Sequence, residues 1–245
     1  MNDLRSIPAY LMRGGTSKGL IFHKKDLPSD RNVLTEYLLK IMGSPDVRQI
    51  NGLGGGTSVT SKVCIISKSL EKDVDIDYFF AQVEVDRNHV DYAPTCGNML
   101  SALGPFAIEE GLVETSDEIT KVNVKSINTN ALITLDVPTP DRKLKYSGDF
   151  KIDGVPGTGS QILMNFKNLE GKTTGNLFPT GNTTDTFDGI NVTCFDLATS
   201  MMICDAKEFN ILGNENSKEL NNNKKLLDKI EKIRLLAGKK MGMGD

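Results

Sequence analysis

The sequence lacks long apolar runs, and no stretch approaches the roughly 20 residues that a membrane-spanning helix needs. Its first residues, Met1-Asn2-Asp3-Leu4-Arg5, are not followed by the apolar segment of a secretory signal peptide. Cysteine is scarce, with four residues in 245, and no two of them form a C-x-x-C pair. These features predict a cytoplasmic protein with reduced thiols and no membrane partner.

Metal ligands and basic clusters are equally sparse. Only two histidines accompany the four cysteines, and the net charge is −3 without a concentrated stripe of lysine and arginine. We therefore expect neither a zinc site nor nucleic acid as a partner. With 38% hydrophobic and 25% charged residues, the chain has the balance of a folded globular protein.

Strand and helix patterns alternate along the chain, which predicts an α/β (α+β) fold. Two short strands are expected around Arg13–Gly19, a turn rich in glycine and hydroxyl groups. Apolar spacing predicts helices at 30–42 and 99–108, and strands at 57–67, 78–85 and within 122–152. Phe178–Asn182 is expected to be a connector.

The N-terminal pattern recurs near the C terminus. Ile7–Met12 aligns with Ile190–Phe195 at an offset of 183 residues, and the same offset places Thr16-Ser17 on Thr199-Ser200. A polar stretch and a helix follow in both places. The repeat predicts two similar lobes, the first over residues 1–187 and the second over 188–245.

The same offset predicts that the second lobe is incomplete. The counterpart of Lys62 would fall at position 245, the last residue of the sequence. The helix expected at Leu220–Leu236 would then have an apolar face without a sheet to cover. We therefore expect a chain cut in mid-domain, with a marginally folded second lobe.

Cys96-Gly97-Asn98 is the most informative segment for chemistry, because it directly precedes the helix expected at 99–108. The unpaired N–H groups and the positive end of a helix dipole favour the thiolate form of a cysteine. The same N–H groups can hold a carboxylate, and Gly97 lets a ligand approach closely. The alternative is a buried cysteine that acts as a small hydrophobic residue.

Lys62 and the Arg13–Lys18 turn are the other candidates. Lys62 interrupts an otherwise apolar strand pattern, and a lysine in an apolar cleft loses its charge more easily and can act as a base. An outward-facing strand lysine is the alternative. The turn offers cations and hydroxyl groups suited to a carboxylate or phosphate, although a plain hairpin explains it equally well.

In combination, these segments resemble those of the PrpF family, in the same order over nearly the whole chain. The family includes 2-methylaconitate cis-trans isomerase, 3-methylitaconate Δ-isomerase and 4-oxalomesaconate tautomerase. The segments are Arg13–Gly19, Gly43-Ser44-Pro45-Asp46, Thr57–Lys62, Cys96-Gly97-Asn98, Gly104-Pro105-Phe106-Ala107 and Phe178–Asn182.

The resemblance implies a diaminopimelate-epimerase-like fold, in which each lobe is a curved, mostly antiparallel sheet wrapped around a central helix. It also implies an isomerase that needs no cofactor or metal and shifts a proton within a small unsaturated di- or tricarboxylic acid. Lys62 and Cys96 take the catalytic positions, and the substrate-binding positions fall on Arg13, Thr16, Ser17, Lys18, Ser61, Gly97 and Asn98.

Three points stay open at this stage: the identity of the acid, whether Lys62 or Cys96 is the base, and the oligomeric state, for which a homo-oligomer is one option. Two other functions also remain. An amino-acid epimerase or racemase of the same fold would need a second cysteine at a helix start. A truncated, catalytically inactive lobe would bind without turnover.

Overall fold

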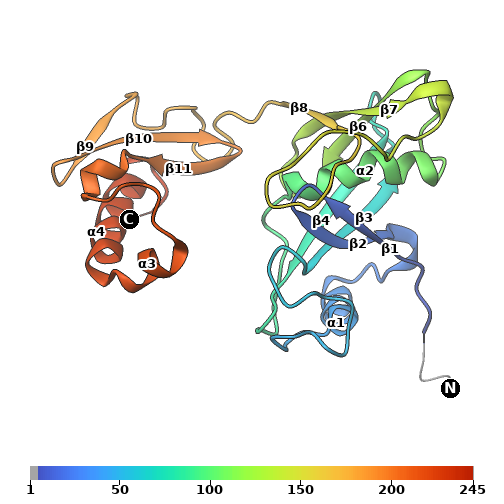
Figure 1. Ribbon diagram of the computed structural model, residues 1–245, viewed down its shortest axis with the longest axis horizontal. Helices are drawn as coiled ribbons and strands as arrows, with labels where there is room; N and C mark the ends of the chain where they lie inside the picture. The colour runs from blue at the N-terminus through green and yellow to red at the C-terminus, as the bar shows by residue number, and fades with distance from the viewer. Residues whose placement is uncertain (1–4, 245) are drawn as a thin grey trace. The chain divides into compact units, whose positions relative to one another are not determined.

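The computed structural model describes residues 5–244. Contacts within the chain separate two compact units, one ending at Lys167 and the other beginning at Asn168 (Figure 1). The sequence predicted this boundary between residues 187 and 188. The structure places it earlier because the segment after Asn168 bonds to a later strand: the Gly171 N–H donates to the Asp196 carbonyl, and the Asp196 N–H donates to the Leu177 carbonyl.

The first unit is built on one eight-stranded sheet of order β1-β2-β3-β4-β6-β7-β8, with β5 paired to β4. The pairs β2–β3 and β4–β6 are parallel and all other pairs are antiparallel. The strands are β1 (Tyr10–Gly14), β2 (Ser17–His23), β3 (Lys62–Lys68), β4 (Ile76–Val83), β5 (Val90–Asp91), β6 (Glu118–Ser126), β7 (Leu132–Thr139) and β8 (Leu163–Lys167).

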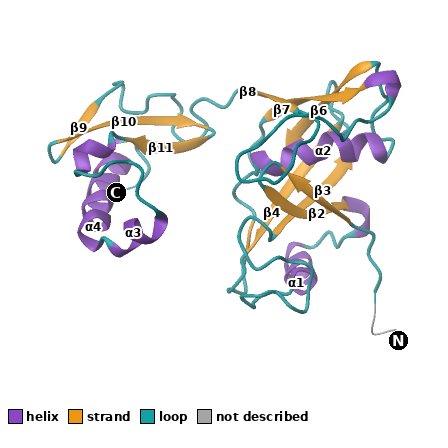
Figure 2. Cartoon of the chain, in the orientation of Figure 1, coloured by secondary structure: helices purple, strands orange, loops and turns teal. Residues whose placement is uncertain are grey.

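Helix α2 (Gly97–Glu109) runs through the centre of this unit and contacts β1 and β2 as well as β6 and β7 (Figure 2). Its core side chains Met99, Leu103 and Phe106 are at most 1% exposed. The helix lies so close to β7 that a Cβ at Gly104 would be 2.5 Å from the Val137 side chain. This unit therefore has the predicted form of a curved, mostly antiparallel sheet around a central helix.

Helix α1 (Arg31–Met42) covers the opposite face of the sheet. Asp30 caps it by accepting hydrogen bonds from the N–H groups of Asn32 and Val33, and Gly43 ends it with a φ of 81°. The helix predicted at 30–42 is confirmed. Its apolar side packs against alternate residues of β2, β3 and β4, among them Leu20, Phe22, Val63, Ile65, Ala81 and Val83. Two short 3₁₀ helices, η1 (Lys24–Asp26) and η2 (Pro140–Arg142), complete this unit.

Two strand predictions extended too far. Residues 57–60 form a turn rather than a strand, because the Thr60 N–H donates to the Thr57 carbonyl and the Thr60 hydroxyl contacts the Thr57 hydroxyl. The β-rich stretch predicted to reach residue 152 ends at Thr139, and η2 and irregular chain follow. No helix of the described residues is long and apolar enough to cross a bilayer.

The second unit contains a three-stranded antiparallel sheet of order β11-β10-β9. Hairpins lie at both places where the sequence suggested a repeat, although Ala198 alone separates β10 from β11, whereas Gly15 and Thr16 separate β1 from β2. The elements are β9 (Asp185–Phe187), β10 (Ile190–Leu197), β11 (Thr199–Ile203), η3 (Ala206–Phe209), α3 (Ser217–Asn222) and α4 (Lys224–Lys240).

The expectation of an uncovered helix face in this unit is wrong. Leu226 and Ile233 of α4 are 6% and 0% exposed, and they share a core with Ile190 and Val192 of β10. The single helix predicted at Leu220–Leu236 is also two helices. Asn223 separates them and caps α4 by accepting a hydrogen bond from the Leu226 N–H.

Ile233→Ala should lower the free energy of unfolding of this unit by about 2–5 kcal/mol, because it leaves a cavity in a fully buried site. Leu235→Ala, on the same helix but 57% exposed, should cost about 0.5 kcal/mol or less. Hydrogen exchange of the β10 amides in both variants measures the difference. Equal losses of protection would show that α4 does not cover this sheet as described.

Candidate active site

The turn between β1 and β2 lies against the start of α2. A Cβ at Gly14 would be 2.5 Å from the Asn98 carbonyl oxygen, and Gly15 adopts a φ of +53° beside the Asn98 amide. Only glycine permits this approach. The Asn98 Nδ2 donates to the Thr16 hydroxyl at 2.9 Å and to the Ser17 hydroxyl at 3.3 Å. The contact joins two segments that lie 81 to 82 residues apart in the sequence.

Cys96 is the N-cap residue of α2 and is 8% exposed. Its side chain makes no capping hydrogen bond, so the N–H groups of the first helical turn remain available to donate to an anion. Apart from its own helix backbone and chain neighbours, nothing in the described part of the chain lies within 4 Å of a Cβ built on Gly97, and both Gly97 and Asn98 are exposed. The helix start is therefore open where a substrate carboxylate would approach.

Lys62 begins β3, with Gly19 of β2 and Gln82 of β4 as its register partners. Its Nζ donates to the Gln82 Oε1 at 2.7 Å and lies 5.2 Å from the centre of the Phe80 ring. Side chains alternate along a strand, so Lys62 and Cys64 share one side of the sheet, and Val63 and Ile65 point to the α1 side.

Cys64 connects Lys62 to the start of α2. It is fully buried, and burial raises the pKa of its thiol, with a further increase from Cys96 and an opposing effect of the positive charge on Lys62. Tyr78 donates to the Cys96 carbonyl at 3.4 Å, and burial beside Cys64 also raises the pKa of this phenol. Lys62 and Cys96 therefore both lie near Cys64, on the α2 side of the sheet.

Ser61, predicted as a substrate-binding residue, lies apart from this group in the structure. It is 0% exposed, it donates to the Val83 carbonyl at 2.8 Å, and it accepts from the Gln49 amide at 2.7 Å. Its hydroxyl group is thus committed to buried partners. It directly precedes β3, and its buried partners are Gln49 and the Val83 backbone rather than the residues around Lys62.

The predicted site residues of the β1–β2 hairpin also lie in different places relative to this group. Lys18 is exposed and, by alternation, lies on the side opposite Ser17, so the structure separates it from the rest of the group. Ser17 is only 2% exposed, and its hydroxyl contacts the start of α2 by accepting a hydrogen bond from the Asn98 side chain. Thr16 is exposed, and Arg13 donates from Nη1 to the Gly15 carbonyl at 2.8 Å.

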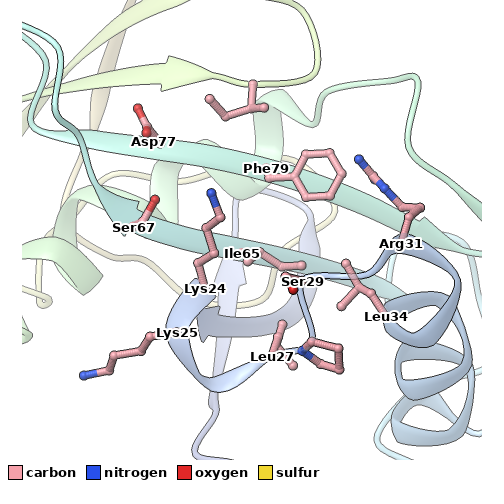
Figure 3. Close-up of a pocket in the computed structure, with 12 residues that line it drawn as sticks. Lys24, Lys25, Leu27, Ser29, Arg31, Leu34, Ile65, Ser67, Asp77 and Phe79 are labelled. Atoms are coloured by element: carbon pink, nitrogen blue, oxygen red, sulfur yellow. The ribbon is translucent and has the colours of Figure 1, made fainter.

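The first unit has cavities on both sides of its sheet, and two of them bear on the position of the site. The smaller, about 280 Å³, lies beside the start of α2, where Arg13, Gly15, Asn98 and Ser101 contribute to its wall. The larger, about 810 Å³, lies on the α1 side. Figure 3 shows Lys24 and Asp77 at this larger cavity, with Lys25 directed away from it.

We place the candidate site at the start of α2 rather than in the larger cavity. None of the predicted site residues lines that cavity, which lies across the sheet from Lys62. Its cations are exposed, and Arg31 is stacked on Phe79 at 4.4 Å. Within residues 5–244, no group of three or more His, Cys, Asp and Glu side chains is arranged to hold a metal ion.

Sequence reasoning missed Gln82, which holds the Lys62 amino group, and the buried pair Cys64 and Tyr78 beneath the site. The alternation in residues 78–85 indicated a strand, but the pairing of Gln82 with Lys62 depends on strand register. A single sequence gives no direct signal for that register.

A lysine, a thiol at a helix start and free N–H donors define a site suited to proton transfer on an anionic substrate. The chain belongs to the PrpF family: the family model described as "PrpF protein" matches residues 4–245. This match confirms the family resemblance identified from the sequence motifs.

Relatives of this family are named as isomerases and tautomerases. The chain is 44% identical to the 4-oxalomesaconate tautomerase of Pseudomonas putida, covering 98% of this chain and 66% of the relative. It is 42% identical to the 3-methylitaconate isomerase of Eubacterium barkeri, covering 99% and 65%. The crystal structure of methylitaconate-delta-isomerase superimposes with a TM-score of 0.84 at 42% identity, covering 97% of this chain and 62% of that one.

These likenesses confirm the predicted α+β, diaminopimelate-epimerase-like fold class. The chain spans 62% to 69% of the length of the relatives it matches. The family match runs to the last residue of the sequence, and these coverages do not establish the predicted truncation.

Cys96 should react with iodoacetamide faster than the other three thiols near neutral pH, because it lies at a helix start. Burial raises the pKa values of Cys64, Cys194 and Cys204, with nearby acidic groups adding to the effect at the last two. Mass spectrometry of the native protein after brief labelling measures the order, and a denatured sample gives the reference. Faster labelling of Cys204 would show that exposure outweighs the helix terminus.

Proposed function

We propose that this chain carries the active site of a cofactor-independent isomerase that shifts a proton within a small unsaturated di- or tricarboxylic acid. The observation that supports this best is that Lys62 and Cys96 both lie near Cys64 on the α2 side of the sheet, with Cys96 at the open N-terminus of α2. The names of the 44% and 42% identical relatives support the same substrate class.

The start of α2 would bind one carboxylate of the substrate. The N–H groups of Gly97 and Asn98 are positioned as donors, and the positive end of the helix dipole favours negative charge. Thr16 and Arg13 lie next to Asn98 and add a hydroxyl group and a cation. These two groups would hold a second carboxylate of the substrate.

The reaction would proceed as a 1,3-proton shift. Lys62, in its neutral form, takes a proton from the carbon allylic to the C=C bond, and the electron pair of that C–H bond delocalises toward a carboxylate. The helix N–H groups stabilise the resulting enolate-like charge. A proton then returns at the far end of the three-carbon unit, from Lys62 or from Cys96, and the double bond has moved.

The two-cysteine epimerase or racemase is not favoured. Cys64 is the thiol near Cys96, and it is fully buried within β3 with a raised pKa. In the described part of the second unit, Cys194 lies inside β10 and Cys204 precedes the four-residue helix η3. We also propose a cytoplasmic location, which the four free cysteines support.

Proton NMR of the purified protein with 3-methylitaconate or 4-oxalomesaconate in D₂O tests this function. We expect migration of the double bond and deuterium at both ends of the three-carbon unit. Fumarate, which has no allylic C–H, serves as the unreactive control. Absence of exchange and isomerisation with both substrates, in protein that is folded by circular dichroism, would contradict the proposal.

A further inference from the structure

We propose that Gln82 is a positioning residue for Lys62. Its neutral amide oxygen holds the lysine amino group in place without favouring the protonated form of that group. The inference rests on the proposed function, because it assigns Lys62 the role of base. Its evidence is separate: the hydrogen bonds of a single amide side chain.

The orientation of the Gln82 amide is determined by its partners. Its Nε2 donates to the Ser58 carbonyl at 3.1 Å and to the Ser61 carbonyl at 2.9 Å, which uses both of its N–H bonds. The Oε1 therefore faces Lys62, 2.7 Å from Nζ. The opposite rotamer would place the NH₂ group against the amino group of Lys62 and the amide oxygen against two carbonyls.

These bonds join three elements of the site. Gln82 lies directly across from Lys62 in the β3–β4 ladder, and its amide group also ties residues 58 and 61 to β4. The chain that enters β3 is thus fixed at two points just before Lys62. The half-buried lysine has its amino group between the Gln82 oxygen and the face of the Phe80 ring.

The neutrality of the acceptor matters for a base. An amide oxygen accepts a hydrogen bond from an ammonium group and from a neutral amine alike, so Lys62 can lose a proton and keep this contact. A carboxylate in the same place would favour the charged form of the lysine. None of the ion pairs within residues 5–244 includes Lys62. The Phe80 ring gives the charged form a weaker, cation–π stabilisation.

Gln82→Glu and Gln82→Met separate this role from a structural one. In Gln82→Glu, we expect the rise of kcat with pH to move about 1–2 pH units toward alkaline values, because the new carboxylate retains the lysine proton. Gln82→Met should lower kcat without that alkaline shift, since it removes the acceptor but adds no charge. Leu70→Glu, at a fully exposed position, controls for the added charge.

A direct titration of Lys62 makes the test independent of turnover. ¹³C NMR of lysine labelled at Cε, assigned with Lys62→Ala, follows the amino group in wild type and in Gln82→Glu. We expect a later midpoint in Gln82→Glu by at least one pH unit. Equal midpoints would overturn the inference, whether or not the protein isomerises 3-methylitaconate. Lack of turnover with a shifted midpoint would instead count against the proposed function alone.

Discussion

Lys62→Ala is expected to lower kcat by about 10²–10⁴, the usual contribution of a positioned acid or base. The substitution removes the amino group that lies over the Phe80 ring and donates to Gln82 on the α2 side of the sheet. The KM for 3-methylitaconate should change much less, because the carboxylates are bound mainly at the start of α2. Steady-state kinetics by NMR measures both constants.

Two further variants make that result specific. Lys62→Arg should restore little activity, because a guanidinium group stays protonated and cannot accept the substrate proton. Lys68→Ala, at the exposed end of the same strand, should leave kcat unchanged. Near wild-type turnover in Lys62→Ala would remove Lys62 from the mechanism and leave Cys96 as the base.

Gly14→Ala is expected to disturb the site without touching a reactive group. The new Cβ would lie 2.5 Å from the Asn98 carbonyl oxygen and 2.8 Å from the Met99 Cα, so the hairpin and the start of α2 must move apart. A displacement of about 1 Å in a catalytic arrangement costs about 10²-fold. We therefore expect kcat/KM to fall by about this factor, and the free energy of unfolding by about 1–3 kcal/mol.

Gly238→Ala is the matched control, because it adds the same methyl group inside α4, where no atom lies within 4 Å of the new Cβ. It should leave kcat/KM unchanged and stabilise the second unit by up to about 1 kcal/mol. Equal activity of Gly14→Ala and wild type would show that the contact between the hairpin and α2 does not position the site.

The sequence was most informative where a local signal determines structure. Asp30 and Gly43 mark both ends of α1, and the apolar run after Cys96 marks the start of α2. The glycine-rich turn predicted a hairpin, and the hairpin is present. For these elements, capping and turn chemistry act over a few residues, so one sequence is sufficient to predict them.

Predictions that depended on register or on tertiary contact were less successful. Lys18 and Ser61 belong to segments near the site, yet strand alternation in β2 directs Lys18 to the other side of the sheet, and Ser61 bonds to Val83 and Gln49. Gln82 was missed because only the β3–β4 pairing brings it to Lys62. The boundary at Lys167 depends on hydrogen bonds between Asp196 and a segment about 20 residues earlier, which no local pattern reveals.

A crystal structure with a bound unsaturated dicarboxylate, such as 3-methylitaconate, tests the central claim most directly. We expect one carboxylate within about 2.7–3.2 Å of the Gly97 and Asn98 N–H groups. We also expect an allylic carbon within about 3.5 Å of the Lys62 Nζ, the separation of a near-attack geometry. A ligand seated instead in the 810 Å³ cavity on the α1 side, with the start of α2 empty, would contradict it.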